Sequence, residues 1–132
     1  MSVYKVKTFG RFARKHRVGD KALVVAAQRV RTGQFDADLG GGLYKQRVAR
    51  NGGGKSGGFR TLLSYRAGGH VFFLYGFAKN QRANIDDDEE TTLKRMGKAL
   101  GAYTQQALDF AVANGDLEEV SDGAEKDDES GA

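Results

Sequence analysis

Val71-Phe72-Phe73-Leu74-Tyr75 decides the fold, because five consecutive apolar or aromatic residues suit a strand that is covered on both faces. We therefore expect residues 70–77 to form the centre of a sheet. Two further strand candidates precede this one, at residues 43–49 and 58–65. The turns between the three strands fall on glycine clusters, Gly52-Gly53-Gly54 and Gly68-Gly69. The sequence thus predicts an antiparallel sheet built from neighbouring strands.

The N-terminal part of the chain predicts one strand and two helices that pack on this sheet. The alternation of apolar and polar residues in Val3-Tyr4-Lys5-Val6-Lys7 favours an edge or outer strand. Thr8 can cap a short helix, and Asp20 can cap a second one over residues 21–31 that ends before Gly33. Each helix has apolar residues on one face, which we expect to cover the sheet.

The C-terminal part predicts one long amphipathic helix followed by a tail. Acidic residues 86–90 suit the start of a helix, where the macrodipole favours negative charge. Apolar residues then recur at spacings of three and four as far as Phe110, which predicts about six turns ending at Gly115. Residues 117–120 could add a short strand. We expect a single α+β domain over residues 1–120 and a disordered acidic tail over residues 121–132.

Charge is divided unevenly along the chain. Residues 1–85 hold 17 Lys or Arg against three acids, a net charge of +14, whereas residues 86–132 hold four bases against 14 acids, a net charge of −10. A domain this basic attracts polyanions, and nucleic acid is the partner that such a charge most often indicates. The alternative is a basic surface that only aids solubility.

Composition excludes several kinds of chemistry. The chain has no cysteine, which removes disulfides, zinc thiolate sites and thiol nucleophiles. The two histidines, His16 and His70, are far apart in the sequence, so we expect no metal and no cofactor. Apolar runs are too short for a membrane span, and the N-terminus does not resemble a secretory signal. These features predict a cytoplasmic protein that does not enter a membrane.

Cations and aromatic residues are predicted to converge on one side of the sheet. Lys45 and Arg47 are two apart on a strand and share a face. Arg60 begins the next strand across the glycine turn, which also contains Lys55. The third strand adds a further group, Tyr75, Phe77 and Lys79. The pattern Gly54-Lys55-Ser56 resembles the end of a nucleotide-binding P-loop, but Ala49 replaces the first required glycine, so we do not expect one.

Such a cluster has the groups that RNA cleavage needs without a metal. The reaction requires removal of the 2′-hydroxyl proton, stabilisation of charge on the phosphate, and protonation of the leaving 5′-oxygen. Arginine suits the second task because its planar fork pairs two phosphate oxygens. A lysine crowded by other cations can move a proton, and Tyr75 or Phe77 can stack on an exposed base. No strong general base is evident.

Three ordered motifs resemble a known family. They are Leu39-Gly40-Gly41-Gly42-Leu43-Tyr44-Lys45-Gln46-Arg47-Val48-Ala49, then Gly54-Lys55-Ser56-Gly57-Gly58-Phe59-Arg60-Thr61, and then Phe72-Phe73-Leu74-Tyr75-Gly76-Phe77-Ala78-Lys79 with Asn84-Ile85. Together they resemble the HigB-type branch of the RelE toxin superfamily over roughly residues 3–120. The resemblance implies a microbial-ribonuclease-like fold with two N-terminal helices against a twisted antiparallel sheet. It also implies cleavage of mRNA in the ribosomal A site and a cognate antitoxin encoded alongside.

The resemblance also suggests roles for individual residues. Lys45 and Arg47 match the strand cations that members place against RNA, and Arg60 matches the arginine that faces the scissile phosphate. Members with a catalytic tyrosine after the last strand have it where this chain reads Ile85-Asp86, so either another residue replaces it or the rate is lower. We prefer Lys55 or Lys79 for this role over Tyr75 or His70. The residues expected to bind RNA around the site are Arg50, Arg66, His70, Phe77 and Arg82.

Two other functions fit the same resemblance and charge. The scaffold could act as a toxin that poisons a topoisomerase without cutting RNA, although the group Lys45, Arg47 and Arg60 argues against this. The chain could also be a nucleic-acid-binding regulator without toxicity. Cut messages, broken DNA or unchanged growth after expression would distinguish the three.

Overall fold

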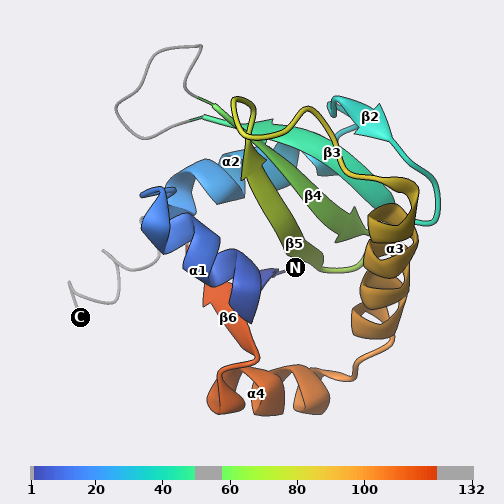
Figure 1. Cartoon of the computed structure of the whole chain (residues 1–132). Helices are drawn as coiled ribbons and strands as arrows, with labels where there is room; N and C mark the ends of the chain where they lie inside the picture. The colour runs from blue at the N-terminus through green and yellow to red at the C-terminus, as the bar shows by residue number, and fades with distance from the viewer. Residues whose placement is uncertain (1, 50–57, 122–132) are drawn as a thin grey trace.

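The computed structural model describes residues 2–49 and 58–121, which form a six-stranded sheet with helices on both faces (Figure 1). The elements in chain order are β1 (Val3–Val6), α1 (Lys7–Lys15), α2 (Asp20–Arg31), β2 (Ala37–Asp38), β3 (Leu43–Val48), β4 (Phe59–Tyr65), β5 (Val71–Ala78), α3 (Asp87–Gly101), α4 (Gln105–Asn114) and β6 (Leu117–Val120). The strand order is β2-β3-β4-β5-β1-β6, and the pairing is antiparallel except between β1 and β5. The predicted α+β class is confirmed.

The helices divide between the two faces of the sheet. On one face, Phe9 of α1 lies 5.2 Å from Phe73, ring centroid to centroid, and the Gln46 side chain donates to the Ala26 carbonyl of α2. On the other face, α3 packs on β4 and β5. A methyl group at Gly97 would lie 2.6 Å from Cβ of Ser64, so a glycine is what allows this close approach. Figure 1 shows α1 and α3 on either side of the central strands.

Strand β5 is the centre of the fold, as predicted. It lies between β4 and β1, and Val71 through Leu74 are each at most 2% exposed. A β-bulge interrupts its pairing with β4, because Leu62 pairs with Tyr75 whereas Leu63 pairs with Phe73. The extra residue, Leu74, packs towards α3. The bulge keeps Tyr75 on the α3 face as well, which matters for the site described below.

The prediction that residues 3–7 form an edge or outer strand is wrong. Strand β1 lies between β5 and β6, and all four of its residues are buried. Lys5 produced the alternation that indicated an exposed face, but its ammonium group is buried in an ion-pair network. It lies 3.1 Å from Asp20 and 3.7 Å from Glu118, carboxylates that come from α2 and β6. Paired in this way, a lysine can be buried in the sheet.

The predicted six-turn helix is in fact two helices. Helix α3 ends at Gly101, and Thr104 starts α4 by accepting a hydrogen bond from the Ala107 backbone N–H with its side chain. The apolar spacing continues across this break, so periodicity alone did not reveal it. Gly115 ends α4 with a φ of 86°, as predicted, and the suggested strand β6 follows. The tail beyond residue 121 lies outside the described residues.

The predicted caps of the first two helices are also wrong. Helix α1 begins directly after Val6 with no side-chain cap, and its first N–H, of Lys7, bonds to the Asp116 carbonyl. Asp20 lies inside the first turn of α2 and instead accepts from Lys5 and from the Ser121 backbone. By contrast, the acids before α3 do form a helix start, as described below.

No helix within the described ranges has the length and apolar composition to cross a membrane.

The turn between α1 and α2 contains a residue in a strained backbone conformation, Arg17. Arg17 has a φ of 56°, the only positive value at a described non-glycine residue, and the Val18 N–H bonds back to the Ala13 carbonyl. This is a helix end at which glycine is normally preferred. We expect Arg17→Gly to raise the free energy of unfolding by about 1 kcal/mol, because it removes the strain of a side chain in the left-handed region. Urea denaturation would measure this, and Lys15→Gly, inside the helix, should be destabilising.

Candidate active site and nucleic-acid interface

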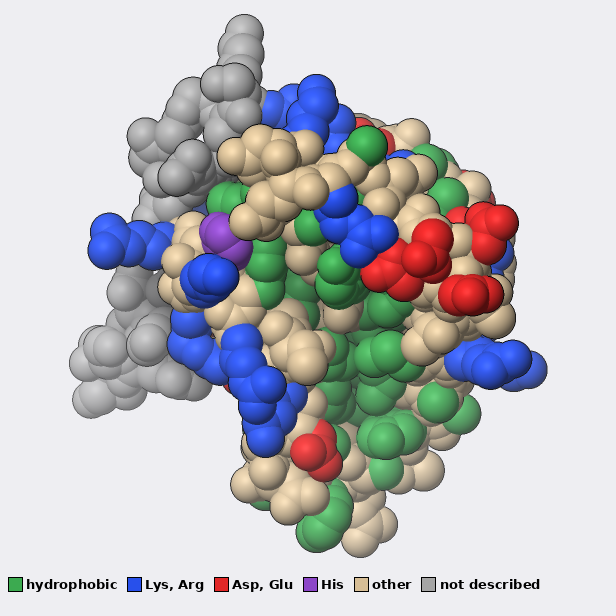
Figure 2. All heavy atoms as spheres, in the orientation of Figure 1, with side chains coloured by type: hydrophobic (Ala, Val, Ile, Leu, Met, Phe, Trp, Pro, Cys, Tyr) green, Lys and Arg blue, Asp and Glu red, His purple; other side chains and the backbone are tan. Residues whose placement is uncertain are grey.

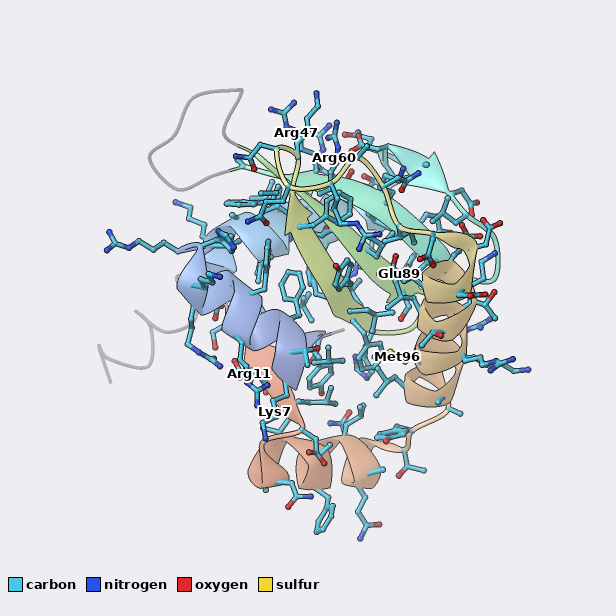
Figure 3. All side chains as sticks on the ribbon, in the orientation of Figure 1. Lys7, Arg11, Arg47, Arg60, Glu89 and Met96 are labelled. Atoms are coloured by element: carbon cyan, nitrogen blue, oxygen red, sulfur yellow. The ribbon has the colours of Figure 1, made fainter. Side chains whose placement is uncertain are left out.

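The sheet brings the central predicted cations together on its α3 face. Arg47 lies directly opposite Arg60 in the β3–β4 ladder, and Arg60 lies opposite Phe77 in the β4–β5 ladder. Opposite residues in antiparallel strands project from the same face, and Lys45 is two residues from Arg47 on that face. Arg47 is exposed and Arg60 is half-buried. Figure 3 shows the two arginines side by side at one end of the sheet. We call Lys45, Arg47 and Arg60 the cationic cluster.

Asp36 contacts the cationic cluster, a contact that the sequence did not predict. Its carboxylate oxygen lies 3.7 Å from a guanidinium nitrogen of Arg60, and its backbone N–H donates to the Lys45 carbonyl. The Asp36 side chain is 44% exposed, so the ion pair is open to water and to a competing anion. Asp36 therefore holds Arg60 in place without blocking it. Only its position, just before the strand β2 that pairs with β3, could have indicated this contact.

Arg82 is bound to a second acid, Glu89, which the sequence analysis treated only as part of a helix start. The two side chains form a bidentate pair with N–O distances of 2.9 and 2.6 Å, and Arg82 also donates to the Tyr75 hydroxyl at 3.1 Å. The guanidinium carbon lies 5.9 Å from the Tyr75 ring centroid and 5.7 Å from that of Phe77. Arg82 is thus fixed over the aromatic part of the face.

Glu89 also completes the start of α3. Its carboxylate accepts from the Asp86 backbone N–H, and the Asp86 side chain accepts from the Glu89 N–H, which forms a capping box. The hydrogen bonds from Arg82 hold the pKa of Glu89 below its usual value, and the Asp86 N–H contributes in the same direction. The pKa of Arg82 is raised in turn, first by Glu89 and then by Tyr75. The Glu89 carboxylate therefore connects the start of α3 to Arg82.

The two aromatic residues of β5 differ in their access to a ligand. Phe77 is only 4% exposed, because its ring is covered by Arg82 and packs beside Tyr75. Its expected contact with RNA stays a prediction. Tyr75 is half-buried and lines a hollow of about 310 Å³ together with Asp88, Thr92 and Leu93. Of the two rings, Tyr75 is the one that a nucleobase can reach.

His70 and Arg66 lie at the other end of the sheet, away from the cationic cluster. Strand β5 runs from Val71 to Ala78, and about 3.3 Å per residue places its two ends roughly 23 Å apart. The His70 ring accepts a hydrogen bond from the Ser2 backbone and packs edge-on against Tyr4, while Arg66 donates to the Gly41 carbonyl. These two residues are therefore not part of the cationic cluster, and their expected binding of RNA stays a prediction.

Three other residues were predicted to be in the site, and the structure describes one of them. Lys79 is exposed and follows the last residue of β5, at the same end of the sheet as Arg47 and Arg60. Arg50 and Lys55 lie outside the described residues. The described chain stops at Ala49 and resumes at Gly58, where a Cβ atom would lie 2.6 Å from Nε of Arg47. The described residue Gly58 thus lies next to the cationic cluster.

The α3 face of the sheet holds three kinds of group. The cationic cluster can bind phosphate, the Tyr75 ring is accessible, and the carboxylates of Asp36 and Glu89 lie on either side. Arg47, Arg60 and Lys45 can meet the oxygens of one phosphodiester, while Tyr75 and Arg82 lie one strand further on. Within residues 2–49 and 58–121, no three His, Asp or Glu side chains are grouped as metal ligands would be. This arrangement is that of a small α+β protein with a cationic sheet face.

The comparison with protein families agrees with that class. A family model described as the RelE toxin of the RelE / RelB toxin-antitoxin system matches residues 1–120. The chain belongs to this family, and its role is that of the toxin, with an antitoxin as the partner that such a system implies. No curated protein matches the chain. The resemblance seen in the sequence is thus confirmed for the family, whereas the HigB-type branch stays a prediction.

Proposed function

We propose that this toxin is a metal-independent endoribonuclease that cuts mRNA in the ribosomal A site. The observation that carries the proposal is the opposed pair of Arg47 and Arg60 on an open sheet face, with Lys45 beside them. Two guanidinium groups on one face can bind the nonbridging oxygens of a phosphodiester bidentately. They also stabilise the additional negative charge that develops on phosphorus during attack.

In the proposed reaction, the 2′-hydroxyl oxygen attacks the adjacent phosphorus while the bond to the 5′-oxygen breaks. The 2′-hydroxyl gives up its proton and the leaving 5′-oxygen gains one, so the products are a 2′,3′-cyclic phosphate and a 5′-hydroxyl end. Lys55 and Lys79 remain our candidates for the proton transfers, and the structure adds the carboxylate of Asp36, beside Arg60, as a third. Tyr75 stacks on a base next to the cut, and Arg82 binds the adjoining backbone.

The open geometry of the site supports dependence on the ribosome. The cationic cluster lies on an exposed surface, and Arg60 is held by an acid that is itself open to water. Such a site does not orient a flexible RNA strand by itself. In the A site the mRNA is already held in place, which supplies the positioning that accounts for much of a catalytic rate. We accordingly place the protein in the cytoplasm, with mRNA and an antitoxin as its partners.

The test is to map the 5′ ends of cellular mRNA within minutes of inducing the chain from a tightly controlled promoter. We expect growth arrest together with new 5′-hydroxyl ends inside translated codons. Arrest with intact messages and broken DNA would instead identify a topoisomerase poison, and unchanged growth with soluble, folded protein would remove the nuclease proposal.

A further inference from the structure

A small cavity lies at the end of the sheet opposite the cationic cluster, where the proposed reaction does not use it. Its volume is about 70 Å³, and it is bounded by the turn that joins β4 to β5 and by the last residues of α3. In Figure 1 this turn passes beside α3. A single water needs roughly 10–15 Å³ of such space, so the cavity can hold several waters or one tetrahedral oxyanion.

Polar side chains line this cavity from one face of the sheet. Ser64 is paired with Phe72 in the β4–β5 ladder, so the two side chains project from the same face. Arg66 follows Ser64 by two residues and His70 precedes Phe72 by two, and both line the cavity. None of the described residues that line it is Asp or Glu. A guanidinium group at a cavity without a carboxylate favours an anion as the occupant.

The Ser64 hydroxyl is a buried polar group at this cavity. Ser64 is 6% exposed, and within residues 2–49 and 58–121 its hydroxyl forms no hydrogen bond. A Cβ atom at Gly97 would lie 3.1 Å from the hydroxyl oxygen, so the glycine of α3 leaves space beside it. Burial of a hydroxyl without a hydrogen-bond partner costs free energy. The Ser64 side chain therefore favours an occupant that accepts a hydrogen bond.

Arg66 and His70 add two further donors, each held by another contact. The His70 Nδ1 accepts from the Ser2 backbone N–H at 3.0 Å, which places the ring proton on Nε2. The Arg66 guanidinium donates to the Gly41 carbonyl at 3.3 Å and has about five N–H donors in all. Both side chains thus keep N–H groups for a ligand. Donors from three residues suit the several oxygens of a tetrahedral oxyanion better than the two oxygens of a carboxylate.

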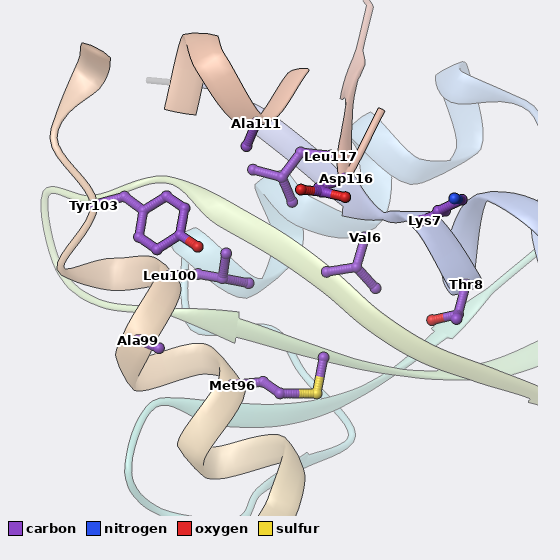
Figure 4. A pocket seen from close by; sticks show the side chains of 10 residues that line it. All are labelled: Val6, Lys7, Thr8, Met96, Ala99, Leu100, Tyr103, Ala111, Asp116 and Leu117. Carbon is purple, nitrogen blue, oxygen red and sulfur yellow. The ribbon is translucent and has the colours of Figure 1, made fainter. Parts of the chain in front are cut away.

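Leu100 and Tyr103 separate this cavity from a larger one. They also line a cleft of about 370 Å³ between α1, α3, α4 and β6. Figure 4 shows the Tyr103 hydroxyl pointing into that cleft, so Tyr103 supplies the small cavity with wall surface rather than with a donor. The larger cleft is mostly apolar and includes Asp116, and Figure 2 shows hydrophobic side chains between α1 and α3. The two cavities therefore differ in the chemistry of the ligand that they can take.

We propose that the small cavity is a second phosphate-binding site, in which Arg66, His70 and Ser64 hold one phosphate group. The planar fork of an arginine pairs two phosphate oxygens, and the hydroxyl and the imidazole N–H can each donate to another. The cavity is partly enclosed, so we expect a phosphate with at most one ester bond, as in inorganic phosphate or at the 5′ end of an RNA. An internal phosphodiester continues as a chain on two sides and does not fit. The site does not depend on RNA cleavage.

The test is an NMR titration of the isotopically labelled full-length chain at constant ionic strength. The ligands are inorganic phosphate, acetate, and a trinucleotide with or without a 5′-phosphate. We expect the amide signals of Gly69 and Gly101, which line the cavity, to shift and to saturate with phosphate and with the 5′-phosphorylated trinucleotide. The signals of Arg47 and Arg60 report separately on the cationic cluster, which can also bind phosphate.

Two variants and a matched control test the donors. Arg66→Met should raise the Kd for phosphate about tenfold, because it removes the charge and keeps a long side chain. His70→Asn should raise it about threefold, because the asparagine oxygen can still accept from the Ser2 N–H whereas the Nε2 donor is lost. Arg95→Met removes the same charge from an exposed residue of α3 that does not line the cavity, and its Kd should stay within about twofold.

The trinucleotides distinguish the sources of the phosphate. Saturation with inorganic phosphate alone would identify free phosphate as the ligand, and binding of the 5′-phosphorylated trinucleotide as well would add the end of an RNA. Equal binding of the two trinucleotides at Gly69 and Gly101 would contradict a site for a terminal phosphate. The proposal would also be overturned by the absence of a saturating shift at these signals, by acetate binding as tightly as phosphate, or by an Arg66→Met variant that binds like Arg95→Met. These results are independent of the nuclease proposal, because no cleavage is measured.

Discussion

Arg60→Ala should lower the rate of mRNA cleavage about a hundredfold while leaving the fold unchanged, a loss on the order of 3 kcal/mol of transition-state stabilisation. Arg60 is the cation with Arg47 on one side and Phe77 on the other, so it is central to the face. Among the described residues Arg60 forms an ion pair with Asp36, which is accessible to water and contributes little to stability. Single-turnover cleavage of mRNA on purified ribosomes would measure the effect.

The matched control for this variant is Arg29→Ala, which removes an exposed arginine from α2 on the other face of the sheet. It should cleave at the wild-type rate. Arg60→Lys should recover only part of the loss, because an ammonium group cannot pair two phosphate oxygens in the way that a guanidinium does. Full cleavage by a folded Arg60→Ala protein would exclude this arginine from the reaction.

Glu89→Gln should lower kcat about tenfold without weakening the binding of RNA. The variant has two effects, one on kcat and one on the affinity for RNA. The variant removes the charge that fixes Arg82 over Tyr75, which lowers kcat because the site is less well ordered. It also removes a negative charge beside an RNA-binding surface, which favours binding. Glutamine at the third helical position keeps the capping box, so the helix start should be preserved.

Glu90→Gln is the control for this second variant, since it removes the same charge one residue later. Glu90 pairs with Lys94 on α3 and, within the part of the chain that the structure describes, forms no side-chain hydrogen bond or ion pair with Arg82 or Tyr75. We expect its kcat to stay at the wild-type value. A Glu89→Gln enzyme with unchanged kcat, or one whose only defect is a raised KM, would show that Arg82 needs no carboxylate to hold it.

The same contact predicts how activity depends on pH. Because Arg82 lowers the pKa of Glu89 in the folded protein, the ion pair is intact at neutral pH and is lost only as the pH falls through that lowered value. We therefore expect wild-type kcat to decline in acid partly through this group. In Glu89→Gln that part of the decline should be absent, which a pH profile of single-turnover rates would reveal.

The sequence predicted those parts of the fold that depend on neighbouring residues. Strands β3, β4 and β5 are joined in sequence order, so their apolar patterns and glycine turns were enough to place Arg47 beside Arg60. Strand β1 was misplaced because its partners are distant: Val3 pairs with Val71 and with Val120. No local pattern indicates such pairing. The break between α3 and α4 had a local sign, the capping residue Thr104, but the apolar spacing ran through it.

The site was predicted less completely, for related reasons. Cations on adjacent strands could be assigned from alternation, whereas Asp36 and Glu89 reach the face from a loop and a helix that sequence spacing does not connect to it. The alternating pattern placed Phe77 on the same face as the cations. It could not predict that Arg82 would cover the Phe77 ring. His70 was placed near the site because the length of β5 was not taken into account.

The position of β6 in the sheet affects when the chain can complete its folding during translation. This strand supplies the neighbour of β1 on one side, and its Glu118 supplies one of the carboxylates that Lys5 requires. During synthesis, β1 is the first of the six described strands to emerge from the ribosome and β6 is the last, so the sheet keeps an unpaired edge until Val120 is free. Pairings between residues so far apart form slowly. The sheet is therefore complete only after residues 117–120 have been translated.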